Sequence, residues 1–363
     1  MRRAPGKLFV AGEYAVVEPG NPALLVAVDR HVTATVSPAT TGVVLSSDLV
    51  AGPVGLHWAD GTLAGHDATD ERRARDGLAH VVAAVEVVGA LLAERGLPAP
   101  AVHVSIDSRL HDNGTKLGLG SSGAVTVATI AAVAAHCGLR LSRDARFRLA
   151  VLATAGLDVR ASGGDLAAGT WGGWIVYRSP DRAAVLDLAR TRGITETLHV
   201  PWPGFRVRRL PPPRGLHLEV GWTGTPASTA SLVSALHRRP WRGTPSHRRF
   251  TRTTNDCVRA ATLALERGDD AELLSQIRRA RRALARLDDE AHLGIFTPGL
   301  TALCDAAEAV GGAAKPSGAG GGDCGIALVD AQAAPRISQL RHQWAAAGLR
   351  PLLVRPATEG NEE

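Results

Sequence analysis

Three glycine-rich segments, far apart along the chain, constrain this sequence more than any other feature. They read APGKLFVAGEY around residue 7, GTKLGLGSSG around residue 116 and KPSGAGGGDC around residue 315. Of the 41 lysines and arginines only three are lysines, and each lies in or beside one of these segments. Glycine lets a backbone approach another group closely, and a compact ammonium reaches a phosphate oxygen in a way that a planar guanidinium does not. We therefore expect all three lysines to lie near bound phosphate groups.

The middle segment contains GLGSSG, residues 118–123, which fits the GxGxxG pattern of dinucleotide-binding folds. That fold requires a strand ending at the first glycine, whereas the polar sequence DSRLHDNGTK precedes Gly118. A P-loop requires Gly-Lys followed by Ser or Thr after the glycines, and this is absent. What remains is a loop that leads into a helix, where amides and the helix dipole favour phosphate oxygens. A dinucleotide-binding oxidoreductase stays open as an alternative, which a strand directly before Gly118 would favour.

Two hydroxyls and an acidic residue add possible chemistry to this loop. Ser121 and Ser122 follow the glycines at the expected first turn, where one can bind Mg²⁺ and the other a phosphate oxygen. Asp165 follows two glycines in ASGGDLAAGTWGG, a position where an Asp is often a helix N-cap. If Lys7 and Asp165 instead face each other across one site, they would serve a kinase as charge stabiliser and base.

The segment GWTGTPAST, residues 221–229, predicts a second anion site. Pro226 suits the first turn of a helix, and Thr225, Ser228 and Thr229 would bring hydroxyls to that helix N-terminus. Simple capping is the alternative. The glycines of the third segment indicate close packing against a loop or ligand, although a plain tight turn also uses glycine.

Composition excludes several classes of protein. The formal charge of +6 is modest, and aromatic residues make up only 4% of the chain, which does not suggest a nucleic-acid binder. The four cysteines show neither CxxC pairs nor zinc spacing, as expected for reduced thiols in a cytoplasmic protein. Neither a secretory signal nor an apolar run of membrane-spanning length is visible, so we expect no membrane partner. The 13 histidines show no metal spacing and are expected at the surface or in the core.

The chain divides into a mixture of strand runs and helix runs, which favours an α+β fold of two domains, residues 1–212 and 213–363. The five prolines of 201–213 are taken as the junction, and the charged stretch 66–76 as a loop. Further expected elements are strands at 4–14, 23–36, 42–58, 101–107 and 216–222, helices at 77–95, 120–136 and after Ser142, helices near 227–238, 247–267, 270–288 and 299–310, and a final strand, helix and strand.

The motifs, in this order and spread over most of the chain, resemble those of the GHMP kinase superfamily. APGKLFVAGEYAVVEPGNPALLVAVDR is similar to the first motif, KLGLGSSGAV to the second and KPSGAGGGDCGIAL to the third. Asp323 in the third motif is more typical of the phosphomevalonate kinases in this superfamily than of its mevalonate kinases. ASGGDLAA resembles the segment with the catalytic Asp, and GWTGTPAST a segment that lines the phosphomevalonate site.

This resemblance implies a fold, a reaction and a set of site residues. The N-terminal domain would resemble the second domain of ribosomal protein S5, and the C-terminal domain would be ferredoxin-like, with the site between them. ATP would be the co-substrate with Mg²⁺, and phosphomevalonate the acceptor. Catalysis is expected from Lys7 and Asp165, and metal binding from Ser122. The nucleotide would be bound by Lys116, Gly118, Leu119, Gly120, Ser121, Ser122 and Gly123. The acceptor would be bound by Tyr14, Ser162, Gly163, Gly164, Thr225, Ser228, Thr229, Ser317, Gly318 and Ala319.

One position departs from the family pattern, and two other functions stay open. Mevalonate kinases carry an acidic metal ligand 11 residues before the catalytic Asp, where this chain has Thr154, so Asp158 or water and phosphate oxygens would have to complete the metal shell. Another GHMP kinase, acting on mevalonate or a sugar, is one alternative. A nucleotide-binding regulator without catalysis is another, which the presence of both Lys7 and Asp165 disfavours. The protein is expected to be a monomer or a homodimer.

Overall fold

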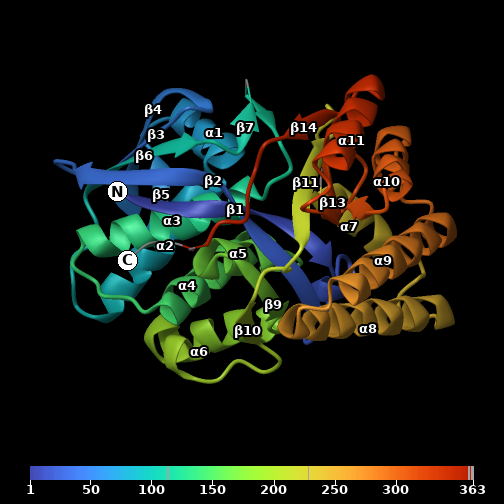
Figure 1. Ribbon diagram of the computed structural model, residues 1–363. Coiled ribbons are helices and arrows are strands. Elements are labelled where there is room, and N and C mark those ends of the chain that lie inside the picture. The colour runs from blue at the N-terminus through green and yellow to red at the C-terminus, as the bar shows by residue number, and fades with distance from the viewer. Residues whose placement is uncertain (113, 228, 359, 361–363) are drawn as a thin grey trace.

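Two β-sheets, one from each half of the chain, organise the molecule (Figure 1). The computed structural model describes residues 1–112, 114–227, 229–358 and 360, without the side chains of 229 and 230. Within these residues the first sheet has eight strands in the order β10-β9-β2-β6-β3-β4-β5, with β1 paired to β2 beside that path. Its strands are β1 (Arg2–Ala11), β2 (Pro22–Pro38), β3 (Val43–Ser47), β4 (Val50–Ala59), β5 (Thr62–Gly65), β6 (Val102–Ser108), β9 (Trp174–Arg178) and β10 (Arg206–Leu210).

Helices of the first half pack on this sheet and on one another. They are α1 (Ala68–Gly77), α2 (Ala79–Glu94), α3 (Ser121–His136), α4 (Arg143–Leu157), α5 (Gly164–Trp171) and α6 (Arg182–His199). The helices α3 and α5 lie on β1 and β2, and α2 and α4 lie against α3. Helix α3 is rich in Ala, Val and Thr and is buried over almost its whole length, as expected of a helix without a polar face. Its small side chains let it lie between the sheet and two further helices.

The second half forms a smaller sheet with long helices beside it. The sheet order is β12-β13-β11-β14, and every pairing is antiparallel. The strands are β11 (Leu216–Trp222), β12 (Ala313–Pro316), β13 (Cys324–Asp330) and β14 (Arg350–Leu352), and the helices are α7 (Thr229–His237), α8 (Pro245–Arg267), α9 (Asp270–Ala291), α10 (Pro298–Ala309) and α11 (Ala334–Ala346). Trp344 of α11 is fully buried, and its indole N–H donates to the carbonyl of Leu303 at 3.0 Å.

The two halves are in direct contact, through packing and hydrogen bonds as well as through the chain segment that connects them. Helix α8 packs against β2 of the first sheet, and one hydrophobic cluster includes residues of both sheets. The chain end also crosses back, since the Asp29 N–H donates to the Arg355 carbonyl at 2.9 Å and the Ala357 N–H to the Ala27 carbonyl at 2.8 Å. The last described residues therefore lie on the first sheet, although they follow the second in sequence.

The structure corrects several of the expected elements. The stretch 66–76 is not a loop: most of it forms α1, whose N-cap Asp67 accepts the N–H groups of Thr69 and Asp70. An N-cap followed by acidic residues is a helix start signal, which the high charge obscured. The segment 201–213 is not a bare junction, because it contains β10, an edge strand paired with β9. Helix α6 and strand β12 were not expected at all. The predicted N-cap Ser142 is confirmed, since its hydroxyl accepts the Ala145 N–H at 3.1 Å.

The dinucleotide-fold alternative fails on the observed topology. The residues before Gly118 form only β8 (Thr115–Lys116), a two-residue strand paired with β7 (His111–Asp112) in a separate hairpin. The first sheet is mostly antiparallel, with one parallel pairing between β3 and β6. A dinucleotide fold requires a parallel strand that leads directly into the glycine loop. Within the described residues no single helix is long and apolar enough to cross a membrane, although α1 and α2 reach that length and hydropathy as a pair bent by 98°.

Candidate active site

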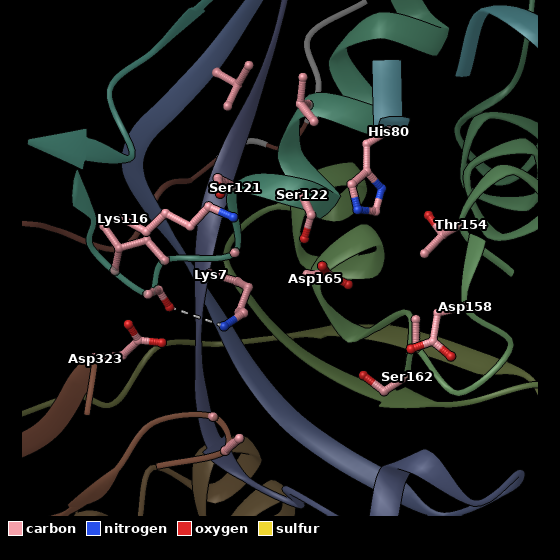
Figure 2. A pocket seen from close by; sticks show the side chains of 18 of the residues that line it. Lys7, His80, Lys116, Ser121, Ser122, Thr154, Asp158, Ser162, Asp165 and Asp323 are labelled. Carbon is pink, nitrogen blue, oxygen red and sulfur yellow. Dashed lines mark hydrogen bonds between the residues drawn. The ribbon is translucent and has the colours of Figure 1, made fainter. Parts of the chain in front are cut away.

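A cavity of about 560 Å³ is lined by residues of both halves of the molecule. The first half contributes β1, the glycine loop before α3, the start of α2 and the stretch around residues 154–165. The second half contributes Ala227, Val233 and the loop between β12 and β13. Figure 2 shows Lys7 at the centre of this cavity, with Asp323 on one side and Asp165 on the other.

Lys7 is held in place by its backbone and leaves its ammonium accessible. It follows a register irregularity of β1 between Pro5 and Gly6, and its own N–H donates to the Leu119 carbonyl at 2.8 Å. The half-buried ammonium lies 3.5 Å from the Gly118 carbonyl and 5.4 Å from the centre of the Phe9 ring. Both contacts are weak at these distances. The cavity therefore contains a compact positive charge that forms no direct ion pair with a described residue.

Asp165 lies in the first turn of α5 and is not its N-cap. The N-cap is Gly163, with φ 75°, and no side chain caps this helix. Among the described residues, the Asp165 carboxylate accepts only the N–H of its neighbour Leu166, at 3.0 Å, and it lines the cavity. The capping interpretation is therefore wrong, and the carboxylate is available to a ligand.

Glycines bring Lys7 and Asp165 to the same loop. A Cβ on Gly120, whose φ is +77°, would lie 2.8 Å from Lys7 Cε and 3.4 Å from Asp165 Cβ. A Cβ on Gly123 would lie 2.5 Å from the Asp165 carboxyl carbon. A side chain at Gly120 or Gly123 would therefore displace Lys7 or Asp165, and at Gly120 it would also be strained by the positive φ. In Figure 2 the contact drawn from Lys7 runs to Gly118, not to Asp165, so the expected Lys7–Asp165 pair is a juxtaposition around Gly120 and not a direct ion pair.

The N-terminus of α3 opens toward the same cavity. Gly120 is its N-cap, in the left-handed conformation and with no side-chain cap, so the first amides of the helix lack a capping acceptor. Such an N-terminus binds phosphate oxygens favourably. The expected nucleotide-binding residues that line the cavity are Lys116, Gly118, Leu119, Gly120, Ser121 and Ser122. Gly123 is buried and does not line the cavity, but the absence of a side chain at this position leaves room for the Asp165 carboxyl group.

His80 is a cavity residue that the sequence reasoning missed. It lies near the start of α2, close to Ser122 and Asp165 (Figure 2), with its Nδ1 at 3.5 Å from the Thr126 hydroxyl. Burial lowers the pKa of this imidazole, against an opposing effect of Asp165, so the ring is neutral at pH 7. A single His in an apolar helix carries no local signal that would have revealed its place in the cavity.

Candidate magnesium ligands gather on the α4 side of the cavity. The described residues contain no group of three His, Cys, Asp or Glu side chains suited to a metal ion. Thr154 and Asp158 line the cavity, and the buried Thr154 hydroxyl has no hydrogen-bond partner. One Asp158 oxygen accepts from the Arg160 N–H at 2.9 Å and pairs with its guanidinium at 3.0 Å. With Ser122, these are the hard oxygen donors that Mg²⁺ prefers, so the residues fit such an ion only when phosphate or water oxygens complete its shell.

The second half of the cavity wall is fixed by Tyr14. Its hydroxyl donates to the Ala319 carbonyl at 2.5 Å, and the ring lines the cavity with Gly318 and Ala319. Burial raises the pKa of Tyr14, and the negative charges of Asp288 and Glu13 raise it further. The phenol therefore stays protonated and holds the loop between β12 and β13 against the segment that follows β1.

Several expected acceptor-binding residues do not reach the cavity. Ser162 lines it, whereas Gly163 and Gly164 are buried beneath it. The Ser317 hydroxyl is also buried, and it accepts the Phe9 N–H at 2.8 Å and donates to the Phe9 carbonyl at 3.1 Å, so it is a bond between domains and not a free ligand. Thr225 is exposed outside the lining.

The rest of the expected second anion site is described only in part. Ser228 lies outside the described residues, and so does the side chain of Thr229, the first residue of α7. Pro226 precedes this helix and is not in its first turn, contrary to the sequence interpretation.

Lys315 is placed differently from the other two lysines. It is fully buried on β12, where its ammonium pairs with the Glu13 carboxylate and donates to the Pro316 carbonyl at 2.6 Å. Lys315 therefore does not line the cavity itself, although its partner Glu13 does. The expectation that all three lysines lie near bound phosphate stays a prediction, and the burial of Lys315 is a feature that local composition did not indicate.

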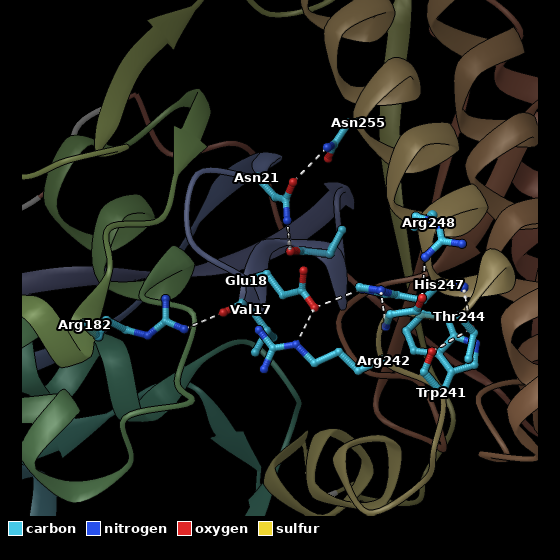
Figure 3. A network of polar contacts seen from close by, with 12 residues as sticks. Val17, Glu18, Asn21, Arg182, Trp241, Arg242, Thr244, His247, Arg248 and Asn255 are labelled. Carbon is cyan, nitrogen blue, oxygen red and sulfur yellow. Dashed lines mark hydrogen bonds and ion pairs between the residues drawn. The ribbon is translucent and has the colours of Figure 1, made fainter.

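A second polar junction between the halves involves the loop between β1 and β2 (Figure 3). Glu18 accepts from the His247 imidazole at 2.9 Å and lies 3.3 Å from the Arg242 guanidinium. The Asn255 amide of α8 donates to Asn21 at 2.8 Å. The loop that includes the short 3-10 helix η1 (Ala15–Val17) is thus tied to α8.

The comparisons with known proteins agree with this architecture. The model of the GHMP kinases N terminal domain matches residues 79–173, and that of the GHMP kinases C terminal domain matches residues 263–346. A phosphomevalonate kinase of Streptomyces sp. (strain CL190) is 68% identical over 99% of this chain and 98% of its own.

Two solved structures are similar along nearly their whole length. The Lin0012 protein from Listeria innocua is 32% identical, with a TM-score of 0.90 over 100% of this chain and 99% of that one. Streptococcus pneumoniae phosphomevalonate kinase, in complex with phosphomevalonate and AMPPNP, is 27% identical, with a TM-score of 0.85 over 98% of both chains. The expected two-domain fold of mixed helices and strands is confirmed. On these findings the chain belongs to the GHMP kinase superfamily, in the family of the phosphomevalonate kinases.

Proposed function

We propose that this protein is a phosphomevalonate kinase. It transfers the γ-phosphoryl group of ATP to the phosphate of (R)-5-phosphomevalonate and releases 5-diphosphomevalonate and ADP, a step of the mevalonate pathway to isoprenoids. The observation that carries the proposal is a cavity where an accessible lysine, a free carboxylate and an uncapped helix N-terminus converge, in a chain 68% identical to a phosphomevalonate kinase. The AMPPNP complex of the Streptococcus relative supports an adenine nucleotide as co-substrate.

The reaction breaks the bond between the β,γ-bridging oxygen and the γ-phosphorus, and it forms a bond from an acceptor phosphate oxygen to that phosphorus. Phosphoryl transfer depends mainly on positioning and charge stabilisation. In our proposal the Lys7 ammonium neutralises the charge that develops on the γ-phosphoryl oxygens. The amides at the start of α3, with Lys116 and Ser121, hold the nucleotide phosphates.

Asp165 orients the acceptor and need not remove its proton. A phosphate monoester has a second pKa of about 6, so it is already largely ionised at neutral pH. This distinguishes the reaction from phosphorylation of an alcohol, where a base must accept the hydroxyl proton. The side chains of Lys7 and Asp165 both lie next to Gly120, so we place the point where the phosphates would meet beside this residue.

We propose that Mg²⁺ accompanies the nucleotide and binds at Ser122. Held there, a divalent cation would supply positive charge that neutralises part of the charge of the nucleotide phosphates. The unpartnered Thr154 hydroxyl and the Asp158 carboxylate lie on the same side and would hold waters of its shell. The acceptor itself would lie against Tyr14, Ser162, Gly318 and Ala319, which line the remainder of the cavity.

The remaining expectations are proposed with the function. The four cysteines are unpaired, and three of them are buried, which supports a reducing, cytoplasmic location. We keep the domain division at residues 1–212 and 213–363, because the described strands change sheet there. We propose a monomer or a homodimer that acts on small molecules alone.

A coupled ADP-release assay tests the function. Phosphomevalonate, mevalonate, homoserine and galactose are compared as acceptors at saturating ATP and magnesium. We expect kcat/KM for phosphomevalonate to exceed that for each of the others by at least about a hundredfold. The other three acceptors carry no phosphate group, and the positive charge of Lys7 favours an acceptor that brings a dianionic phosphate close to the γ-phosphoryl group. Equal rates with mevalonate would contradict the assignment to phosphomevalonate and leave the kinase superfamily intact.

A further inference from the structure

Asp323 is an acidic residue in a cavity that we assign to phosphate groups. It follows the glycines of the third segment, is half-buried, and lines the cavity beside Lys7, Lys116 and Ala227. Figure 2 shows its carboxylate on the opposite side of Lys7 from Asp165 and far from Ser122. A carboxylate repels phosphate oxygens, so direct binding of the acceptor does not explain why it is there.

The hydrogen bonds of Asp323 explain its position better. The Thr223 N–H donates to the Asp323 carbonyl at 2.9 Å, and the Asp323 N–H donates to the Thr225 carbonyl at 2.8 Å. The Ala227 N–H then donates to the Asp323 side-chain oxygen at 3.0 Å. One residue thus binds alternate positions of the segment 223–227, which leads into α7 at the cavity edge.

The same side chain is pressed against the nucleotide loop. A Cβ on Gly118, whose φ is +74°, would lie 2.4 Å from Asp323 Cβ and 2.6 Å from its carboxyl carbon. Asp323 itself has φ +53°, a left-handed conformation that glycine adopts more easily than other residues. Three glycines precede it, yet an acid stands at this strained position. Its side chain therefore has a use that glycine could not supply.

The charges around Asp323 fit the same picture. Burial raises the pKa of this carboxyl, while the Ala227 N–H and the charges of Lys7 and Lys116 lower it. The carboxyl group thus faces two cations and one amide donor. It holds the segment 223–227 at the edge of the cavity that both lysines line.

We propose that Asp323 is a positioning residue for the phosphate-bearing acceptor. Through Thr225 and Ala227 it holds the start of α7 against the loop at Gly118, so that an acceptor phosphate is presented to Lys7 at a fixed distance. It touches neither phosphate. The inference rests on the proposed function, because it names the part of the same site that sets acceptor affinity.

The test separates the hydrogen bond from the charge with two variants and one control. Asp323→Gly removes the acceptor of the Ala227 N–H but tolerates the same φ, whereas Asp323→Asn keeps an oxygen acceptor. The control is Asp330→Gly, since Asp330 also accepts a backbone N–H, that of Gln332 at 2.9 Å, but lies exposed at the far end of β13. KM for phosphomevalonate, KM for ATP, KM for Mg²⁺ and Tm are measured for each.

Loss of one oriented hydrogen bond in the glycine variant should raise KM for phosphomevalonate by about tenfold, with KM for ATP within about twofold and Tm not lowered. The asparagine variant should recover most of that loss, and Asp330→Gly should change neither KM. An unchanged acceptor KM in Asp323→Gly overturns the inference. Equal rises of KM for phosphomevalonate and KM for ATP together with a lower Tm would also overturn it, because they indicate a structural role. A raised KM for Mg²⁺ in both Asp323 variants would overturn it as well, because it indicates a metal ligand. If the wild type does not phosphorylate phosphomevalonate, the proposed function itself fails.

Discussion

The second and third glycine-rich segments have similar compositions but do different things. In the segment around residue 116 the lysine is exposed, lines the cavity and precedes an uncapped helix N-terminus. In the segment around residue 315 the lysine is fully buried and paired with Glu13 from the first half of the molecule. Ser317 binds the backbone of Phe9, and the Cys324 thiol donates to the Leu117 carbonyl at 2.9 Å. The second segment is a candidate ligand loop, and the third fastens the two halves together.

The comparison shows that glycine next to lysine indicates a close approach, not what approaches. Around residue 120 the approaching groups are side chains of the site, and the amides remain free for a ligand. Around residue 320 the approaching group is protein backbone, since a Cβ on Gly320 would lie 2.5 Å from the Ile295 carbonyl oxygen. Substitutions of Lys315 and Gly320 should therefore change stability, and those in the second segment should change kinetics. Asp323, at the end of the third segment, is the exception, because its side chain lines the cavity.

The largest effect is expected for Lys315→Met. Removing one partner of a buried ion pair leaves an uncompensated charge on Glu13, which costs about 3–5 kcal/mol of folding free energy. Urea unfolding measures this directly. A double variant, Glu13→Leu with Lys315→Met, should recover most of the loss, because it removes both charges. A Lys315→Met protein with unchanged stability and a raised KM for ATP would instead indicate that the third segment acts on the nucleotide.

Asp165→Asn is expected to lower kcat by at least about a hundredfold, the lower range for charge-orienting or acid–base groups. The fold should remain intact, because the carboxylate makes no capping bond. Steady-state kinetics and circular dichroism check the two parts. A variant with a near wild-type rate would show that Asp165 is not part of the catalytic site.

Lys116→Met should raise KM for ATP by about tenfold, as expected when one charged contact to a phosphate is lost. Its side chain is exposed, so the midpoint of urea unfolding should stay unchanged. In the same two assays, Lys116→Met should therefore change KM for ATP and not stability, whereas the main effect of Lys315→Met should be on stability. Loss of stability in Lys116→Met would remove the distinction between the segments.

The smallest effect is expected for Glu18→Gln. This junction also joins the two halves, but the Arg242 side chain beside Glu18 is 69% exposed, whereas Lys315 is 0% exposed. Exposed ion pairs contribute roughly 0–1 kcal/mol, and glutamine can still accept from His247. Urea unfolding should therefore show a change below about 1 kcal/mol. A loss as large as that of Lys315→Met would show that burial does not distinguish the two junctions.

Local signals predicted one part of this molecule well and another part poorly. Gly118 to Ser122 and the helix that follows were predictable, because loop, cap and helix lie next to each other in sequence. So was Ser142 as an N-cap. Strands β10 and β12 were missed because they are short and depend on partners far away in sequence. The burial of Lys315 was not predictable because its partner, Glu13, is 302 residues away.

Within the site, the groups carried by the motifs could be predicted and their surroundings could not. Lys7 and Asp165 line one cavity, as their motifs indicated. His80 was missed because it reaches the cavity only through the packing of α2 on α3. The role of Ser317 was misjudged because a hydroxyl in a glycine loop looks the same in sequence whether it faces a ligand or a neighbouring backbone.

The most direct test of the account is the chemical identity of the product. Phosphomevalonate, ATP and magnesium are incubated with the purified protein, and the product is followed by ³¹P NMR. The account predicts loss of the phosphomonoester signal and growth of two coupled signals from a new diphosphate, in equal amounts with ADP. An unchanged phosphomonoester signal, or a second monoester on a carbon-bound hydroxyl, would contradict transfer to the acceptor phosphate.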